Sequence, residues 1–142
     1  MTELQTTVSK TIAAPASKLF DAWLDPARLA TFMLPKPGMP QPEVSIDARV
    51  GGRFDILMDT GESKIPHHGE YLEIDRPNRL VFSWNSPFSV EGSKVTIEFT
   101  ENSTGETEIT LTHTKFPSEE SRNNHEAGWG NILSSLEEVS AT

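Results

Sequence analysis

The chain has 142 residues and a formal net charge of −9, from 21 acidic and 12 basic residues. This length fits one domain spanning residues 1–142, and the acidic balance without a Lys/Arg cluster excludes a surface that binds nucleic acid by neutralising phosphates. The absence of cysteine excludes disulfides and Cys-ligated zinc or iron–sulfur sites.

The first third of the chain predicts one strand followed by two short helices. Residues 6–12 are rich in β-branched side chains, which favour a strand. From Ala16 to Leu24, apolar residues recur at helical spacing, and Pro15 suits the position just before a helix. Asp25-Pro26 ends this helix, and a second short helix extends to about Phe32.

A proline-rich connection then leads into two strands on either side of a glycine pair. Four prolines over residues 35–42 predict an irregular segment. Apolar and polar residues alternate over 44–46 and again over 54–58, on both sides of Gly51-Gly52. This pattern predicts two antiparallel strands joined by a tight turn, because glycine tolerates the positive φ that such turns require.

Four further strands and one long helix complete the predicted elements. Turn signals and alternation predict strands over residues 68–74, 80–84, 94–100 and 109–114. The last helix begins near Ser118, a plausible N-cap, and runs to about Val139 with a bend near residues 128–130. Its predicted buried face consists of Trp129, Ile132, Leu133, Leu136 and Val139.

These elements predict an α+β protein. A single curved antiparallel sheet of six or seven strands has one polar face, and its other face needs a cover. The C-terminal helix is the only predicted element long enough to provide it, with two short helices after the first strand. Gly128 and Gly130 cost about 1 kcal/mol each within that helix, so close helix–sheet contact or room for a ligand beside Trp129 must offset them.

Five segments, in their order along the chain, carry a family resemblance. They are Leu19–Pro26, Gly51-Gly52, Gly69–Ile74, Arg79–Trp84 and His125–Trp129. The sequence resembles the family of activator of heat-shock protein 90 ATPase homologues over roughly residues 6–139. This family is a branch of the SRPBCC superfamily, which also holds START lipid-transfer domains and plant pathogenesis-related proteins. The resemblance implies a helix-grip fold with a cavity between the sheet and the C-terminal helix.

Inward-facing positions and the resemblance together predict a ligand-binding wall that opens near the 32–42 loop. The candidate ligand-binding residues are Phe32, Met33, Phe54, Met58, Phe82, Trp84, His113, Trp129 and Leu133. Phe32-Met33 stands where the family often has a Trp pair before a proline, which keeps apolar bulk and changes its shape. For Trp129, a role as a core anchor is the alternative to ligand contact, and the two are compatible.

The histidines give little indication of metal binding or catalysis. There is no His-Glu-x-x-His motif, and His67 and His68, adjacent on one strand, should point to opposite faces. The sequence also lacks a Gly-x-Ser-x-Gly motif, a P-loop and a dinucleotide fingerprint. We therefore predict no metal, no cofactor and no catalytic residue. His113 is the best acid–base candidate if the protein is an enzyme, and otherwise a hydrogen-bonded wall residue.

Three functions follow from these observations. The first is binding of a hydrophobic small molecule in the cavity, with a role in stress response. The second, implied by the resemblance, is a co-chaperone-like regulator of heat-shock protein 90 ATPase, with a chaperone as partner. The third is an enzyme acting on a small hydrophobic substrate. Without a signal peptide pattern in residues 1–10 or an apolar stretch of about 18 residues, we expect a cytoplasmic protein with no membrane insertion.

Overall fold

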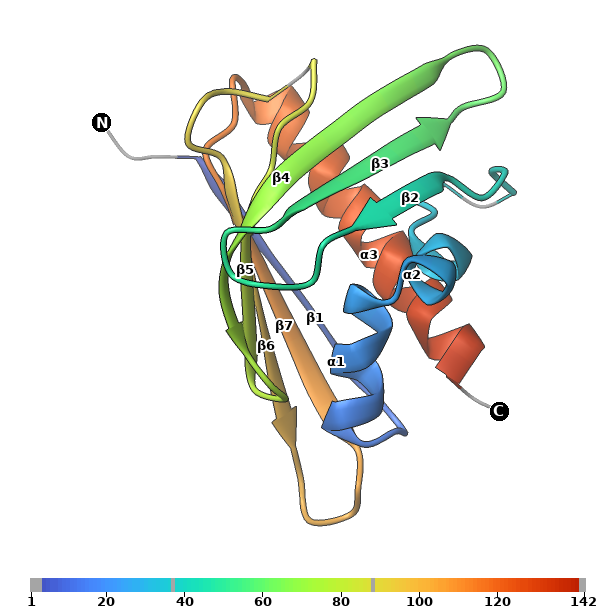
Figure 1. Ribbon diagram of the computed structural model, residues 1–142, viewed down its shortest axis with the longest axis vertical. Coiled ribbons are helices and arrows are strands. Elements are labelled where there is room, and N and C mark those ends of the chain that lie inside the picture. The colour runs from blue at the N-terminus through green and yellow to red at the C-terminus, as the bar shows by residue number, and fades with distance from the viewer. Residues whose placement is uncertain (1–3, 37, 88, 141–142) are drawn as a thin grey trace.

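The computed structural model describes residues 4–36, 38–87 and 89–140. In this part of the chain, one antiparallel sheet carries three helices on its inner face (Figure 1). The strands are β1 (Gln5–Ile12), β2 (Glu43–Ile46), β3 (Arg53–Asp59), β4 (Lys64–Asp75), β5 (Arg79–Ser83), β6 (Lys94–Glu101) and β7 (Thr107–Thr114). The helices are α1 (Ala16–Leu24), α2 (Pro26–Phe32) and α3 (Glu119–Ser140). The predicted α+β helix-grip architecture is confirmed.

The long strand β4 joins two parts of the sheet. The strand order is β1-β7-β6-β5-β4-β3-β2, and residues 64–70 of β4 pair with β3 whereas residues 71–75 pair with β5. The register is irregular between Tyr71 and Glu73. Such a bulge bends its strand, and Figure 1 shows β3 and the first part of β4 diverging from β5, β6 and β7. The bend creates the space that the helices fill.

Side-chain caps fix the starts of α2 and α3, and apolar faces hold the helices against the core. Asp25 Oδ1 accepts a hydrogen bond from the Ala27 amide at 3.0 Å and so caps α2. Ser118 Oγ accepts from the Ser121 amide at 3.1 Å, which confirms the predicted N-cap of α3. The buried face of α3 contains Trp129, Ile132, Leu133 and Leu136, and the helix lies against β1 and α2. The sequence prediction was wrong for Val139, which is 43% exposed, because the buried stripe continues from Leu136 to Ser140 and leaves Val139 at its edge.

Two predictions need correction, the connection between β2 and β3 and the start of β4. The connection between β2 and β3 is a six-residue loop over residues 47–52 and not a tight turn. Gly51 has the predicted positive φ, at 84°, whereas Gly52 serves a close approach, because a Cβ there would lie 2.2 Å from the Asp47 carbonyl oxygen. The loop also caps the β4 bulge, since Gly51 N donates to Tyr71 O and Tyr71 N donates to Gly52 O, both at 2.9 Å. Strand β4 begins at Lys64, four residues before the predicted start.

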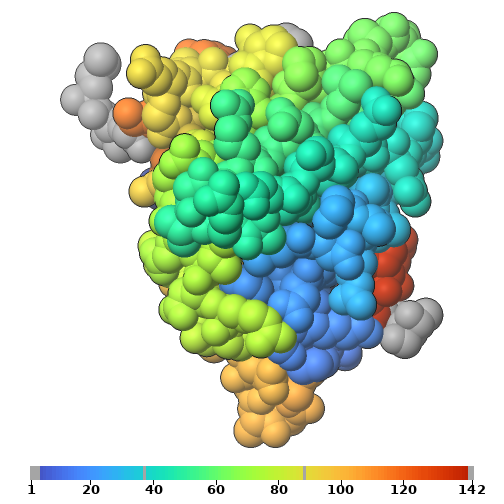
Figure 2. Space-filling view, in the orientation of Figure 1, coloured from blue at the N-terminus to red at the C-terminus, as the bar shows by residue number. Residues whose placement is uncertain are grey.

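The outer surface carries projecting loops and hairpins. Figure 2 shows the 47–52 loop beside α1 on one face and the tip of the β6–β7 hairpin projecting beyond the body of the protein. Within the described ranges, no helix combines the length and apolarity needed to cross a membrane. The largest apolar side chains instead form one continuous core between the sheet and the helices.

Candidate functional site

A cavity of about 250 Å³ lies between the β3–β4 hairpin, the loop after α2 and the middle of α3. Most of its wall is apolar or aromatic. The lining residues are Pro35, Lys36, Met39, Met58, Thr60, Ile65, His67, Trp84, Asn124, His125, Gly128, Trp129 and Ile132. None of these is a carboxylic acid, although the chain as a whole has a net charge of −9. The cavity is therefore suited to an apolar molecule without positive charge.

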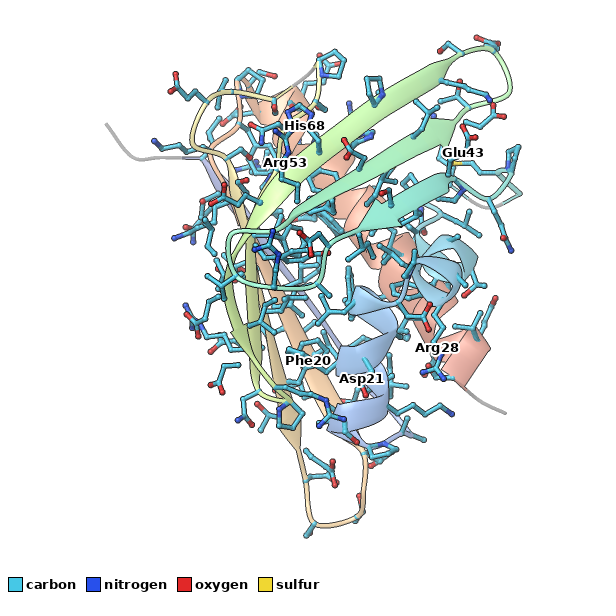
Figure 3. The ribbon with its side chains drawn as sticks, viewed as in Figure 1. Phe20, Asp21, Arg28, Glu43, Arg53 and His68 are labelled. Carbon is cyan, nitrogen blue, oxygen red and sulfur yellow. The ribbon has the colours of Figure 1, made fainter. Side chains whose placement is uncertain are left out.

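Strand alternation turns one side of the β3–β4 hairpin toward this cavity. On β3, Ile56 and Met58 are buried, and they pair with His67 and Ile65 on β4. Because successive strand residues face opposite sides, His67 points inward while His68 takes the other face. His68 lies beside the segment after β5, where its backbone pairs with that of Asn85 (Figure 3).

Gly128 brings the loop after α2 against α3 at the cavity edge. A Cβ on Gly128 would lie 3.2 Å from Pro35 Cβ, so a larger residue would press on the loop. Asn131 Nδ2 donates to the Pro35 carbonyl oxygen at 2.8 Å and fixes the same contact. Gly130, in contrast, has no atom within 4 Å of an added Cβ. The close approach expected from the glycines thus occurs at Gly128, with the loop and not with the sheet.

Trp129 is held by a hydrogen-bonded chain behind the cavity wall. Its Nε1–H donates to His113 Nδ1 at 3.0 Å, so the other ring nitrogen of His113 carries the proton. That Nε2–H donates to Ser93 Oγ at 2.7 Å, and the Ser93 hydroxyl donates to the Thr114 carbonyl at 3.1 Å. Burial lowers the pKa of His113 to about 3, which keeps the ring neutral. Both nitrogens of His113 are therefore engaged, and this ring positions Trp129.

His67 differs from His113 because one of its nitrogens is unused. Its Nδ1 lies 3.1 Å from the Ile65 carbonyl oxygen, which can only accept, so Nδ1 carries the proton. Burial lowers the pKa of His67 to about 4, and the ring is neutral near pH 7. Its ring packs against Trp84 with centroids 5.1 Å apart. The Ile56 carbonyl on β3 also interacts with the ring, but no hydrogen bond of normal geometry joins Nε2 to a described residue.

A family model, Activator of Hsp90 ATPase homolog 1-like protein, matches residues 13–141. The chain belongs to this family. Among curated proteins, no sequence matches it significantly.

Solved structures agree with the assignment to this activator-like family. An HSP90 activator from Plasmodium falciparum is 26% identical, with 96% of this chain and 95% of that one covered and a TM-score of 0.75. A protein from Nitrosomonas europaea is also 26% identical, with 96% and 93% covered and a TM-score of 0.76. A protein from Chromobacterium violaceum is 21% identical, covers 97% of both chains with a TM-score of 0.79, and shows similarity of fold alone.

In the structure, the nine predicted site residues fall into three groups. Met58, Trp84 and Trp129 line the cavity. Met33, Phe54 and Phe82 line a smaller inner space of about 10 Å³, which also borders Trp84. The remaining three, Phe32, His113 and Leu133, are buried and border neither space. The 10 Å³ space is near the minimum for one water molecule.

Several residues that line the cavity were not among the predicted site residues, above all His67. Its inward position follows from the alternation of Ile65, His67, Gly69 and Tyr71 along β4. That signal was available, but Pro66 and Gly69 interrupt the strand pattern. Met39 lines the cavity from the loop after α2, within the 32–42 segment, and Ile132 lines it from α3. Among the described residues, no cluster of potential metal ligands is present.

Proposed function

We propose that the protein binds a small hydrophobic molecule in the 250 Å³ cavity between the β3–β4 hairpin and α3. The observation that carries this proposal is an apolar and aromatic lining, from Met58, Trp84 and Trp129, that reaches the loop at Pro35. Ligand sites are commonly concave, mostly apolar and equipped with few polar groups. A role in stress response and a cytoplasmic location are parts of the same proposal.

The test is binding of small aromatic and aliphatic compounds, followed through the indole N–H resonances of the tryptophans. Trp84 and Trp129 line the cavity, whereas Trp23 lies at the inner space. We expect a ligand to shift the signals of Trp84 and Trp129 first. If a broad compound set leaves both signals unchanged at millimolar concentration, the small-molecule proposal is wrong.

A second function, regulation of heat-shock protein 90 ATPase, is supported by a different observation. The family model carries that name, and the Plasmodium falciparum neighbour is an HSP90 activator. The test is the ATPase rate of a purified chaperone of this class with increasing amounts of the protein. A saturable change in rate supports this function, and an unchanged rate at high stoichiometry rejects it.

The third function considered from the sequence is an enzyme acting on a small hydrophobic substrate. Its acid–base candidate, His113, has no free ring nitrogen. Both ring nitrogens of His113 already have partners, Trp129 and Ser93. A catalytic proton transfer by this ring would break the hydrogen bond that positions Trp129. Between these two, small-molecule binding is therefore better supported than the enzymatic function.

A further inference from the structure

The polar groups around the cavity differ in how far they lie from bulk solvent. Lys36, Thr60 and Asn124 are exposed at the rim, and His125 is half-buried. His67 is 9% exposed and lies among the apolar lining. A ligand that fills the cavity therefore displaces water from His67 more completely than from the rim groups.

Near His67, the side chains of the cavity wall offer a ligand a hydrogen-bond acceptor and no accessible free donor. The Trp129 N–H is already donated to His113. The Trp84 N–H has no partner but is closed off from solvent, so a cavity ligand does not reach it. His67 Nε2 is a lone-pair acceptor, because Nδ1 holds the proton against the Ile65 carbonyl. It also forms no hydrogen bond of normal geometry with the described chain, yet it is not among the atoms closed off from solvent.

An unpaired acceptor in an apolar wall discriminates between ligands. A molecule that offers an O–H or N–H to Nε2 replaces the water lost from that atom, whereas an isosteric hydrocarbon leaves the acceptor buried without a partner. The 250 Å³ volume corresponds to about eight water molecules at roughly 30 Å³ each, which suits a compound of one or two rings. The lack of lining carboxylates gives no counter-charge for a cationic ligand.

Resting on the proposed function, we infer that the ligand is an uncharged one- or two-ring compound with a hydroxyl donor, and that His67 Nε2 accepts its hydrogen bond. His67 is then the specificity-determining residue of the cavity. The indole of Trp84, against which the His67 ring packs, holds the imidazole in this orientation.

The test compares 2-naphthol with 2-methylnaphthalene, which has a similar shape but no donor. Dissociation constants for both are measured by NMR titration with the wild type, with His67→Phe and with His68→Phe as the matched control on the opposite face. In the wild type and in His68→Phe, the ratio of the two constants should favour 2-naphthol by roughly 2- to 12-fold more than in His67→Phe. An unchanged ratio in His67→Phe overturns the inference.

A second measurement does not depend on the folding of any variant. The ¹⁵N resonance of His67 Nε2 in the wild type should move downfield with 2-methylnaphthalene, which removes its hydrogen bond to water, and much less with 2-naphthol, which replaces that bond. If both probes bind but affect this nitrogen equally, the ligand-binding function stands and the role of His67 is wrong. If neither probe binds, this inference is wrong, whereas the proposed function is decided by the broad compound set.

Discussion

The indole N–H of Trp129 and Nδ1 of His113 form a buried hydrogen bond of 3.0 Å that connects α3 to β7. The bond places one indole face against the cavity while the N–H points away from the ligand space. Because Trp129 can only donate at this atom, it also determines which nitrogen of His113 carries the proton. The two residues thus form a unit, with His113 as the support and Trp129 as the wall.

Replacement of Trp129 by alanine should strongly destabilise the protein. The side chain is 2% exposed, and its loss leaves a large void beside His113, so the free energy of unfolding should fall by about 3–5 kcal/mol. Urea unfolding followed by circular dichroism measures this change. Val139→Ala on the same helix is the control, with an expected change within about 0.5 kcal/mol. An equal effect of both substitutions would contradict the assignment of the buried face.

Acidification should destabilise the protein through its two buried histidines. Burial lowers the pKa of His67 to about 4 and of His113 to about 3, from the usual 6.5. Between these values and pH 6.5 the unfolded chain binds more protons than the native state. The stability contributed by the neutral rings is therefore complete above pH 6.5 and decreases as the pH falls, by about 1.4 kcal/mol per pH unit for each ring.

This pH dependence can be assigned by comparing variants. Urea unfolding of the wild type, His67→Phe and His113→Phe at pH 7, 6 and 5 gives three slopes of unfolding free energy against pH. Each variant should have a shallower slope than the wild type, since one of the two contributing rings is absent. A wild-type slope in either variant would show that the replaced ring is not the titrating group.

The two methionines near the site should respond differently to tryptophan. Met58 borders the 250 Å³ cavity, so Met58→Trp should fill that space and abolish binding of 2-naphthol with a modest loss of stability. Met33 borders only the 10 Å³ inner space, and Met33→Trp should overpack the core at a cost of about 1–3 kcal/mol. Thermal unfolding and NMR titration of both variants test this contrast, and equal destabilisation would argue against it.

The two glycines that flank Trp129 should also differ when changed to alanine. Gly130→Ala meets no neighbouring atom and improves helix propensity, so the free energy of unfolding should rise by about 0.5–1 kcal/mol. Gly128→Ala brings a methyl group to 3.2 Å from Pro35 Cβ, and displacement of the loop should remove part or all of that gain. Urea unfolding compares the two, and a larger gain at Gly128 would show that the loop contact is soft.

Much of the fold was predictable because alternation and helical spacing are local signals. The two faces of β6 follow directly from Val95, Ile97 and Phe99, which alternate with threonines and charged residues. The start of β4 was missed because Pro66 and Gly69 weaken the strand pattern. The exposure of Val139 was missed because its apolar side chain suggested burial, whereas Ser140 is the residue that continues the buried stripe of α3.

The site was only partly predictable because alternation gives the direction of a side chain and not its depth. Phe54 and Met58 lie on the same face of β3, yet Phe54 borders the inner space and Met58 borders the cavity. Their separation depends on the bulge in β4 and on the ring of Trp84. Both are products of packing between distant segments, so the sequence indicated which residues face inward and not which of them meet a ligand.

Trp84 is the one described residue that borders both the cavity and the inner space. The Trp84 side chain therefore stands between a larger and a smaller space, and its indole N–H forms no hydrogen bond that a rotation would break. A smaller apolar residue at this position would join the two spaces into one elongated chamber. Substitution at this one position would therefore change the size of the enclosed space without any change in the strands or helices around it.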